Sequence, residues 1–324
     1  MRKQWITGVY GVPCTVAVLV LGLLLGGCGD PSSGTEAAPP PTATGSDDGS
    51  KPPSSTSRER PAPSQPANKA TNGAPGTGRA PTVLYLGDSL AMENQKVLGG
   101  LLKTQLNARY TSAPYSGTTL CDYLTGTGAK SLVPDGDKAA TLVRKLHPDV
   151  VVLQFWGNAW GYTPCMDGIT YDKDKATYLA RYAADAKKLS TQISEAGAGA
   201  GRPKVMWVLQ GPDAMTPDRV RQVNDVYRGR ASSSGDLLAD AGRAVSPASG
   251  RYTWTETLPC TAYERAHPVY CTKPSQNLTE LHRGDDILHF CLAPTTPKSR
   301  PCPARSPGVL RMARAITEAV AKAS

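Results

Sequence analysis

A serine, a histidine and an aspartate in this 324-residue chain have the types that nucleophilic catalysis requires. Ser89 stands in Gly-Asp-Ser at the end of an apolar run, and Asp286 and His289 form the pattern Asp-x-x-His. A serine attacks an ester only when a base removes its proton, and a third group can orient that base. In one helical turn, this spacing would let the carboxylate hold one imidazole nitrogen while the other faces the serine. Ser89 is therefore a candidate nucleophile, His289 a candidate base and Asp286 a candidate for the residue that orients it.

Other residues compete for two of these roles. The chain holds four histidines. His147 precedes an expected strand, at the wrong end of the sheet, and His267 lies in a cysteine-rich loop. Asp285 competes with Asp286 as the orienting carboxylate. An alternative is a metal site with His282, Asp285, Asp286 and His289 as ligands. Such a site would leave Ser89 without a base.

Negative charge that develops on the substrate oxygen needs hydrogen-bond donors. The candidates are the backbone N–H groups of Ser89 and Gly117 and the side-chain amide of Asn158. Glycine lets the backbone approach a ligand closely, and an asparagine amide donates without titrating. Ser89 could instead cap a helix, and Gly117 or Asn158 could be a turn residue. Gly126 and Gly128 lie near enough to compete with Gly117.

Buried apolar runs alternate along the chain with amphipathic segments, which predicts an α/β fold. We expect a doubly wound, mostly parallel sheet flanked by helices, in a flavodoxin-like three-layer arrangement. Residues 246–305 carry many Pro, Thr and Cys and are expected to be irregular. The expected strands lie within 82–90, 108–117, 149–155, 203–212 and 236–241, and the expected helices cover 90–107, 137–146, 174–196, 216–230 and 309–322.

The candidate residues fall at corresponding places in this pattern. Gly-Asp-Ser at 87–89, Gly117 and the pair Gly157-Asn158 each follow an expected strand. Ligands of doubly wound sheets bind beyond the carboxyl ends of the strands. Three segments that are distant in sequence therefore point to the same edge of the sheet.

The N-terminal part differs in composition from the rest. Residues 1–27 combine Arg2 and Lys3 with an apolar stretch and small residues, as in a secretory signal. Cys28 follows Leu-Gly-Gly, which resembles a bacterial lipobox and predicts lipidation of Cys28; a retained membrane anchor is the alternative. Residues 28–80 are rich in Pro, Ser and Thr and are expected to form a disordered tether. We assign 81–324 to the folded domain.

Six cysteines remain once Cys14 and Cys28 are set aside. An even number in an exported domain favours disulfides, although the connectivity is open. Pairing near neighbours and joining the remaining two gives Cys121–Cys165, Cys260–Cys271 and Cys291–Cys302. A metal cluster is disfavoured because no Cys-x-x-Cys pair occurs.

Charge argues against a nucleic-acid partner. The chain has 36 basic and 27 acidic residues; the signal removes two basic ones and the tether five of each, which leaves +7 for the domain. No dense Lys/Arg block with interleaved aromatic residues is present, so no nucleic-acid binding is expected. A mild positive field suits an anionic cell envelope.

Four short blocks, taken in order, resemble those of the SGNH or GDSL hydrolases. They are Gly-Asp-Ser at 87–89, Gly117 in YSGTT, Gly157-Asn158 in FWGNAW, and DDILH at 285–289. The resemblance covers about 82–323 and implies the same triad, with Ser89, Gly117 and Asn158 forming the oxyanion hole. The third block departs from the family pattern Gly-x-Asn-Asp, because Gly157 directly precedes Asn158 and Ala159 replaces the aspartate.

The resemblance implies a serine esterase that removes ester-linked acyl groups from cell-envelope carbohydrate or lipid. It is close to the SGNH domains of envelope O-acylation proteins, so an O-acyltransferase with the same acyl-enzyme is one alternative. A non-catalytic, glycan-binding lipoprotein is another, supported by the altered third block. Trp156 and Trp160 would form a platform for the substrate or belong to the core. We expect no cofactor and no metal, and a location at the outer face of the bacterial cell membrane, held there by the lipid.

Overall fold

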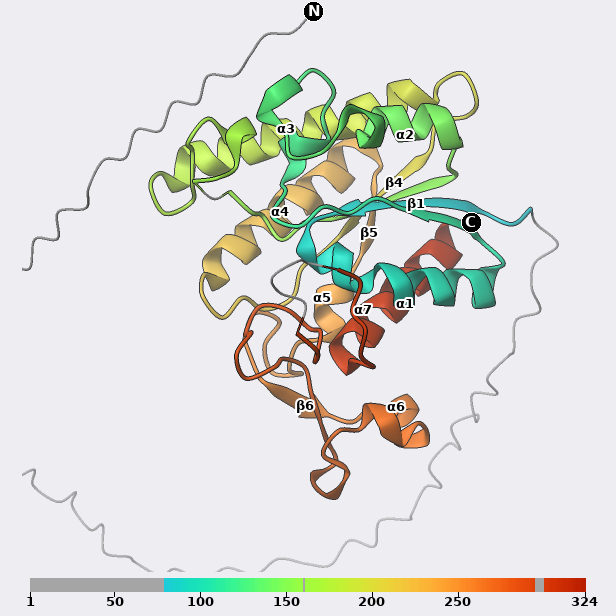
Figure 1. Ribbon diagram of the computed structural model, residues 1–324, viewed down its shortest axis with the longest axis vertical. Coiled ribbons are helices and arrows are strands. Elements are labelled where there is room, and N and C mark those ends of the chain that lie inside the picture. Colours follow the sequence, from blue (N-terminus) through green and yellow to red (C-terminus); the bar gives the residue numbers. More distant parts are fainter. Residues whose placement is uncertain (1–78, 160, 295–299) are drawn as a thin grey trace, which may run out of the picture. The chain divides into compact units, whose positions relative to one another are not determined.

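The computed structural model describes residues 79–159, 161–294 and 300–324 (Figure 1). The expected signal, the lipidation site Cys28, most of the tether and Trp160 lie outside these ranges. Within them, no helix combines the length and the apolar composition that crossing a membrane would need.

Five strands form one parallel sheet in the order β2-β1-β3-β4-β5. This is the flavodoxin-like order of doubly wound sheets, and it confirms the expected fold class. The order reverses between β1 and β3, so the switch point lies where these two strands end. The strands are β1 (Thr82–Gly87), β2 (Arg109–Ser112), β3 (Val150–Gln154), β4 (Lys204–Val208) and β5 (Leu237–Ala239).

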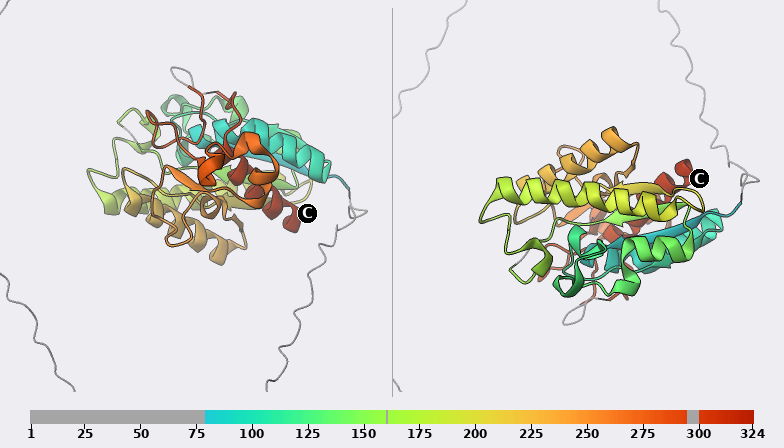
Figure 2. Two further views of the ribbon diagram at one scale, coloured as in Figure 1. Left: turned by 90° about the horizontal axis from the view of Figure 1, so that it is seen from below. Right: turned by 90° about the horizontal axis from the view of Figure 1, so that it is seen from above.

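Helices cover both faces of the sheet (Figures 1 and 2). One layer holds α1 (Ser89–Leu106), α5 (Ala241–Ala244) and α7 (Pro307–Ala323), and the other holds α2 (Ala139–Leu146), α3 (Lys175–Gly197) and α4 (Pro217–Ser234).

The strands are apolar throughout because both faces are buried. In β1, Val83 and Tyr85 pack into the core beneath α1 and α7, whereas Leu84 and Leu86 pack into the core beneath the opposite layer. Each buried side chain of this size contributes about 1.5–3 kcal/mol.

The segment 246–305 is more regular than its composition suggests. It contains α6 (Ala262–Ala266) and an antiparallel pair of strands, β6 (Thr257–Pro259) and β7 (Leu278–Glu280). These elements are too short to show a hydrophobic period. The capping box formed by Thr261 and Glu264 is the signal that marks the start of α6.

Short 3-10 helices fill the connections. Three of them, η1 (Leu120–Tyr123), η2 (Gly128–Lys130) and η3 (Asp135–Asp137), follow β2, in a stretch where no element was expected. The others are η4 (Pro164–Met166), η5 (Pro268–Tyr270) and η6 (Pro274–Gln276).

Disulfides pair Cys121 with Cys165, Cys260 with Cys271 and Cys291 with Cys302. These are the pairs that the spacing of the cysteines led us to expect. The first joins the loop after Gly117 to the loop after Asn158. It therefore ties together two of the segments that carry candidate site residues.

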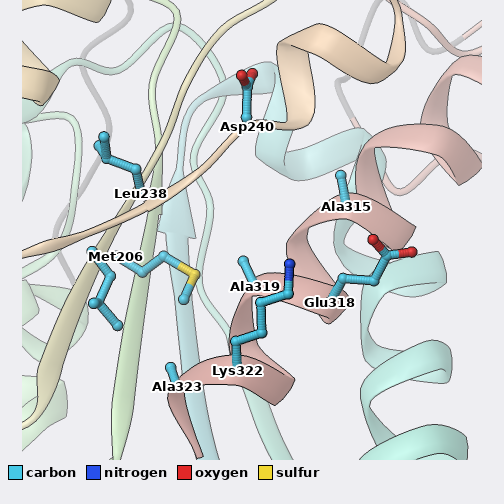
Figure 3. Close-up of a pocket in the computed structure, with 9 residues that line it drawn as sticks. Met206, Leu238, Asp240, Ala315, Glu318, Ala319, Lys322 and Ala323 are labelled. Carbon is cyan, nitrogen blue, oxygen red and sulfur yellow. The ribbon is translucent and has the colours of Figure 1, made fainter.

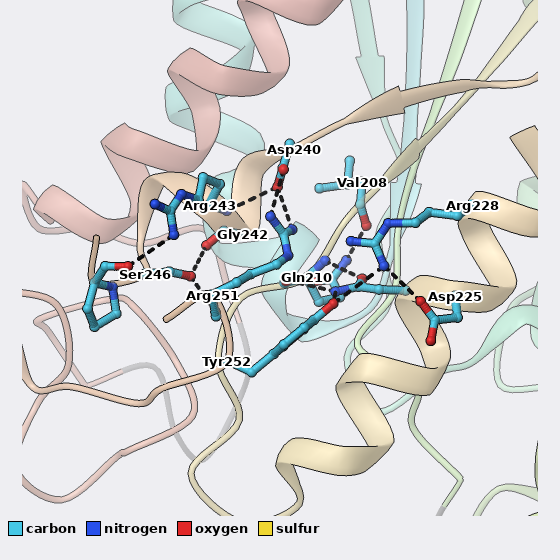
Figure 4. A network of polar contacts seen from close by, with 12 residues as sticks. Val208, Gln210, Asp225, Arg228, Asp240, Gly242, Arg243, Ser246, Arg251 and Tyr252 are labelled. Atoms are coloured by element: carbon cyan, nitrogen blue, oxygen red, sulfur yellow. Dashed lines mark hydrogen bonds and ion pairs between the residues drawn. The ribbon is translucent and has the colours of Figure 1, made fainter. Parts of the chain in front are cut away.

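A polar network anchors the loop 246–252 beside β5 (Figure 4). Arg251 pairs with Asp240, and the Ser246 hydroxyl lies within hydrogen-bond distance of the carbonyl oxygens of Gly242, at 2.6 Å, and Arg251, at 2.7 Å. The Tyr252 hydroxyl lies 3.5 Å from an Arg228 nitrogen of α4. The loop is thereby fixed on both sides before it reaches Trp254.

Candidate active site

Ser89 is the first residue of α1, directly after the turn that ends β1. The preceding Asp88 is the helix cap, and its side chain accepts a hydrogen bond from the Leu90 N–H at 3.1 Å. Gly87 is needed in this turn, because a Cβ there would lie 2.0 Å from the Gln154 carbonyl oxygen. Asp88 therefore performs the capping, and the Ser89 hydroxyl is left for another contact.

That contact is the imidazole of His289. Its Nε2 lies 3.0 Å from Ser89 Oγ, and its Nδ1 lies 3.0 Å and 3.1 Å from the two carboxylate oxygens of Asp286. Serine, histidine and aspartate thus form a continuous hydrogen-bonded chain, although 200 residues separate the first two.

Asp286 and His289 lie in a tight turn, not in the helical turn that their spacing suggested. The Asp286 N–H donates to the Arg283 carbonyl oxygen at 2.9 Å, and the segment has no helical hydrogen bonds. Asp286 Oδ1 accepts hydrogen bonds from the N–H groups of Leu288, at 3.3 Å, and His289, at 3.1 Å. The carboxylate therefore orients both the imidazole and the backbone that carries it. We call residues 283–290 the base turn.

The ionisation of this pair suits a base held by a charged partner. Burial opposes the charge on Asp286, but the hydrogen bond and the positive charge of His289 outweigh it and lower the pKa of Asp286 to about 2. Burial likewise opposes the imidazolium, yet the carboxylates of Asp286, Glu93 and Asp88 raise the pKa of His289 above its ordinary value. Asp286 stays ionised at neutral pH, and His289 gains basicity.

The competing assignments are separated in space. Asp285 is exposed and pairs with Arg283. His282 is buried, and its Nδ1 lies 2.9 Å from the His289 carbonyl oxygen. His147 ends α2 and lines a different cleft, and His267 stacks on the Tyr263 ring. The four residues of the alternative metal site therefore do not converge on one point.

The oxyanion candidates line a single cleft of about 190 Å³ with the nucleophile and the base. Gly117 and Asn158 both belong to its wall, whereas Gly126 and Gly128 do not. In the described part of the chain, neither the Ser89 N–H nor the Gly117 N–H donates to a protein acceptor. Ser89 and Gly117 both line this cleft, so their backbone N–H groups are candidate donors to an oxygen bound there.

Asn158 is held in place by contacts from two sides. Its Nδ2 lies 3.2 Å from Asp88 Oδ2 and 3.2 Å from the Thr118 carbonyl oxygen. Asp88 Oδ2 also accepts the Trp156 N–H at 2.6 Å. Burial raises the pKa of Asp88 to about 6, although the N–H groups of Trp156 and Leu90 favour its charged form. Asp88 thus fixes the shortened third block, which the sequence did not suggest.

Gly117 has a left-handed backbone, with φ of 74°, that favours glycine. A Cβ at this position would lie 3.3 Å from the ring of Tyr162. Tyr162 is 59% exposed and lines the cleft, so it covers the glycine while remaining open to a ligand. Sequence reasoning missed Tyr162, because nothing in its neighbourhood shows that it contacts Gly117.

Trp156 belongs to both the core and the cleft. It is 7% exposed, and the Arg219 guanidinium stacks on it with Cζ 4.2 Å from the ring centroid. Arg219 in turn pairs with buried Asp213 at 3.1 Å. The structure therefore supports a rigid wall at Trp156 and gives no broad exposed platform there.

Buried tyrosines hold the loops at this edge of the sheet. The Tyr123 hydroxyl lies 2.7 Å from the Gly87 carbonyl oxygen and 2.8 Å from that of Ala113. The Tyr178 hydroxyl donates to the Gly157 carbonyl oxygen at 2.5 Å, and the Tyr227 hydroxyl donates to that of Phe155 at 2.8 Å. The Tyr178 and Tyr227 bonds satisfy buried carbonyls, and the single Tyr123 proton satisfies one of its two carbonyls at a time. These hydroxyls thereby help to fix the loops that carry site residues.

The base turn is braced from the side of the 246–252 loop. The Trp254 indole N–H donates to the Ile287 carbonyl oxygen at 3.0 Å, and its ring stacks on His282 at 5.4 Å. Arg283 Nη1 donates to the Ala293 carbonyl oxygen at 2.8 Å.

Two other places in the described part of the chain lack this chemistry. A cleft of about 380 Å³ between β5 and the end of α7 is lined mainly by apolar side chains, with Asp240, Glu318 and Lys322 at its border (Figure 3). Among the described residues, Cys121, Asp122 and Cys165 meet the spacing of a metal site, but both sulfur atoms are joined in a disulfide. Neither place offers a nucleophile next to a base.

Comparison with known proteins gives structural matches alone. No family model and no curated protein matches the chain. Among solved structures, the lipopolysaccharide acetyltransferase periplasmic domain of Salmonella ser. Paratyphi A is 12% identical, with 77% of this chain and 87% of that chain covered and a TM-score of 0.45.

A carbohydrate esterase family 3 protein from Talaromyces cellulolyticus is 13% identical, with 74% and 96% covered and a TM-score of 0.41. A member of the lipolytic protein G-D-S-L family from Veillonella parvula is 13% identical, with 74% and 98% covered and a TM-score of 0.38. At these values function has to be argued from the site itself.

Proposed function

We propose that the protein is a serine esterase that removes ester-linked acyl groups through an acyl-enzyme. The observation that carries the proposal is the hydrogen-bonded chain from Ser89 Oγ through both nitrogens of His289 to Asp286. A nucleophile, a base and an orienting carboxylate in this geometry are the parts that covalent acyl transfer needs.

In the first half-reaction, Ser89 Oγ attacks the ester carbonyl while His289 Nε2 takes the hydroxyl proton. The C–O bond to the alcohol then breaks, and His289 returns the proton to the departing alkoxide. In the second half-reaction, water gives a proton to His289 and attacks the acyl carbon. The bond between Ser89 Oγ and the acyl carbon then breaks, His289 returns the proton to Ser89 Oγ, and the free acid leaves. Asp286 stays ionised throughout and stabilises the imidazolium.

The tetrahedral intermediates carry a negative oxygen that the N–H groups of Ser89 and Gly117 and the Asn158 amide would stabilise. Each donor of this kind lowers the activation barrier by about 3–4 kcal/mol. All three residues line the cleft, and the Asn158 amide, which also contacts Asp88 and the Thr118 carbonyl, would share or exchange one of these contacts for the oxyanion.

The compartment follows from the cysteines. Three disulfides persist in an oxidising environment, which favours an exported protein. We extend the proposal to acylated carbohydrate or lipid of the cell envelope, supported by the likeness of the motif order to SGNH domains. Lipidation at Cys28 would keep the enzyme next to such a substrate.

Turnover of p-nitrophenyl acetate tests the reaction. Wild type should release p-nitrophenol, and Ser89→Ala should lose activity by at least about 10³-fold while its circular dichroism stays unchanged. Equal activity of the two proteins would refute the assignment.

The fate of the acyl group decides between hydrolysis and transfer. With a sugar hydroxyl as acceptor, an O-acyltransferase would give acylated sugar, and an esterase would give free acid. Mass spectrometry of envelope glycans from cells with and without the protein gives the direction in vivo. More O-acyl groups without the protein would support the esterase, and fewer would support the transferase.

A further inference from the structure

One buried acidic residue next to the site has no part in the reaction described above. Glu93 lies one helical turn after Ser89 in α1 and is 2% exposed. Its carboxylate oxygen Oε2 accepts a hydrogen bond from the Phe290 N–H at 3.0 Å. Phe290 directly follows His289, so this bond runs from the helix of the nucleophile to the turn of the base.

The backbone of Glu93 contacts the other end of the same segment. Its carbonyl oxygen accepts a hydrogen bond from the Cys302 N–H at 3.3 Å, and Cys302 is joined to Cys291 by a disulfide. One residue of α1 therefore holds both sides of the segment that the disulfide closes.

Burial of the Glu93 carboxyl group costs free energy of folding. Its Oε1 has no hydrogen-bond partner among the described residues. Burial raises the pKa of Glu93 to about 7, although the charge of His289 and the Phe290 N–H favour the ionised form. At a buried position, an apolar residue of similar volume often stabilises the fold as much as a charged group does, or more. A contribution to folding stability therefore does not explain why a glutamate lies at position 93.

Asp286 cannot hold the base turn against α1 as Glu93 does. Asp286 belongs to the same turn as His289 and fixes the imidazole relative to that turn. Trp254, which lies outside α1, holds the turn through the Ile287 carbonyl. The carboxylate of Glu93 contacts the turn from the element that carries Ser89.

Taking the proposed esterase as its premise, we propose that Glu93 is a positioning residue for the base. Through the Phe290 N–H it holds the base turn against α1, and its negative charge favours the imidazolium that forms when His289 takes the serine proton. It touches neither substrate nor the reacting atoms and acts through His289.

The charged and titratable groups around Glu93 come from three elements. His289, Asp286 and Arg283 face it from the base turn, and Tyr85 faces it from β1. Asp88, at the start of α1, acts on His289 together with Glu93. Of these, His289 and Asp88, whose pKa is raised to about 6, change charge near neutral pH. Asp88 is the same in all Glu93 variants, so the effect of a change at Glu93 should be read in the titration of His289.

Two variants separate the contact from the charge. Glu93→Gln keeps an oxygen that can accept the Phe290 N–H but removes the charge, and Glu93→Ala removes both. Glu264→Gln is the matched control, because Glu264 is buried as well but pairs with Arg311 in α7.

We expect Glu93→Ala to lower kcat for p-nitrophenyl acetate on the order of 10- to 100-fold with little change in KM, because a misplaced base costs this much. Glu93→Gln should keep most of the kcat that is reached at high pH, and its acid limb should move to lower pH. Glu264→Gln should lower the melting temperature without moving the pH profile. Wild-type kcat and an unchanged acid limb in both Glu93 variants would overturn the proposal.

An NMR titration of the His289 imidazole separates this proposal from the esterase itself. The pKa of His289 should be lower in Glu93→Gln than in wild type, whether or not the protein turns over an ester. An unchanged His289 pKa would remove the role of the charge, even if Ser89 proves to be an active nucleophile. The titration compares wild type with Glu93→Gln, so it remains informative if Glu93→Ala fails to fold.

Discussion

The Asp88 carboxylate accepts a hydrogen bond from the Asn158 side-chain amide at 3.2 Å. The aspartate of the nucleophile turn thereby holds the oxyanion candidate of the third block, 70 residues away. This bond offers an explanation of how a block that has lost its own aspartate can still place an asparagine beside Ser89.

Removing either partner of this bond should damage catalysis. Asn158→Ala should lower kcat for p-nitrophenyl acetate by about 10²–10³-fold, as loss of one oxyanion donor does. Asp88→Asn should lower it too, because an amide nitrogen can then face the Trp156 and Asn158 donors. Asp185→Asn, at a buried carboxylate of α3 that pairs with Arg181, is the control and should leave kcat unchanged. Wild-type kcat in Asn158→Ala would remove Asn158 from the hole.

Gly117→Ala tests the second donor. The positive φ should cost about 1–2 kcal/mol of stability, and the new Cβ would press on Tyr162, which should also lower kcat. Gly126→Ala provides the matched control, because Gly126 has a similar φ of 86° but open space around it. Both variants should lose comparable free energy of unfolding in urea, and Gly117→Ala alone should lose turnover. Equal kcat in the two variants would argue against a role for Gly117.

Substitution of the neighbouring aspartates Asp285 and Asp286 should have very different effects on kcat. Asp286→Asn should reduce kcat on the order of 10²–10⁴-fold with a small effect on KM, because the amide favours the wrong imidazole tautomer. Asp285→Asn alters an exposed ion pair with Arg283 and should change kcat less than about twofold. Steady-state kinetics of both variants would settle the choice, and the reverse order of effects would exchange their roles.

The pH dependence follows from the base. His289 must be neutral to take the serine proton, so kcat/KM is lost as pH falls through the His289 pKa. Because the surrounding carboxylates raise that pKa, the acid limb should have its midpoint above the ordinary histidine value of 6.5. Asp286, with its pKa lowered to about 2, should add no inflection near neutral pH. A midpoint below the ordinary value would contradict the raised pKa of His289.

Much of the site could be predicted because its residue types are scarce and their order along the chain is informative. Only four histidines compete for the base, and three segments that end strands lead to one edge of the sheet. The α/β class followed from continuous apolar strands that alternate with helices. The prediction of a helical turn at 286–289 was wrong, because Asp-x-x-His spacing also fits a tight turn.

The residues that sequence reasoning missed act through contacts over long separations. Asp88 meets Asn158, Glu93 meets Phe290, and Tyr178 meets the Gly157 carbonyl. Nothing in the local pattern distinguishes these residues from an ordinary cap, a helix-surface glutamate or a core tyrosine. Their roles appear only when burial and partners are known.

Covalent labelling with a fluorophosphonate tests the central claim that Ser89 is an activated nucleophile. The folded protein should take up one phosphonyl group, and peptide mapping by mass spectrometry should place it on Ser89. Labelling should disappear in Ser89→Ala, in His289→Ala and in wild type denatured before treatment. If the folded wild type remains unlabelled, or if Ser89→Ala is labelled as fast as wild type, Ser89 is not the nucleophile and the esterase assignment falls.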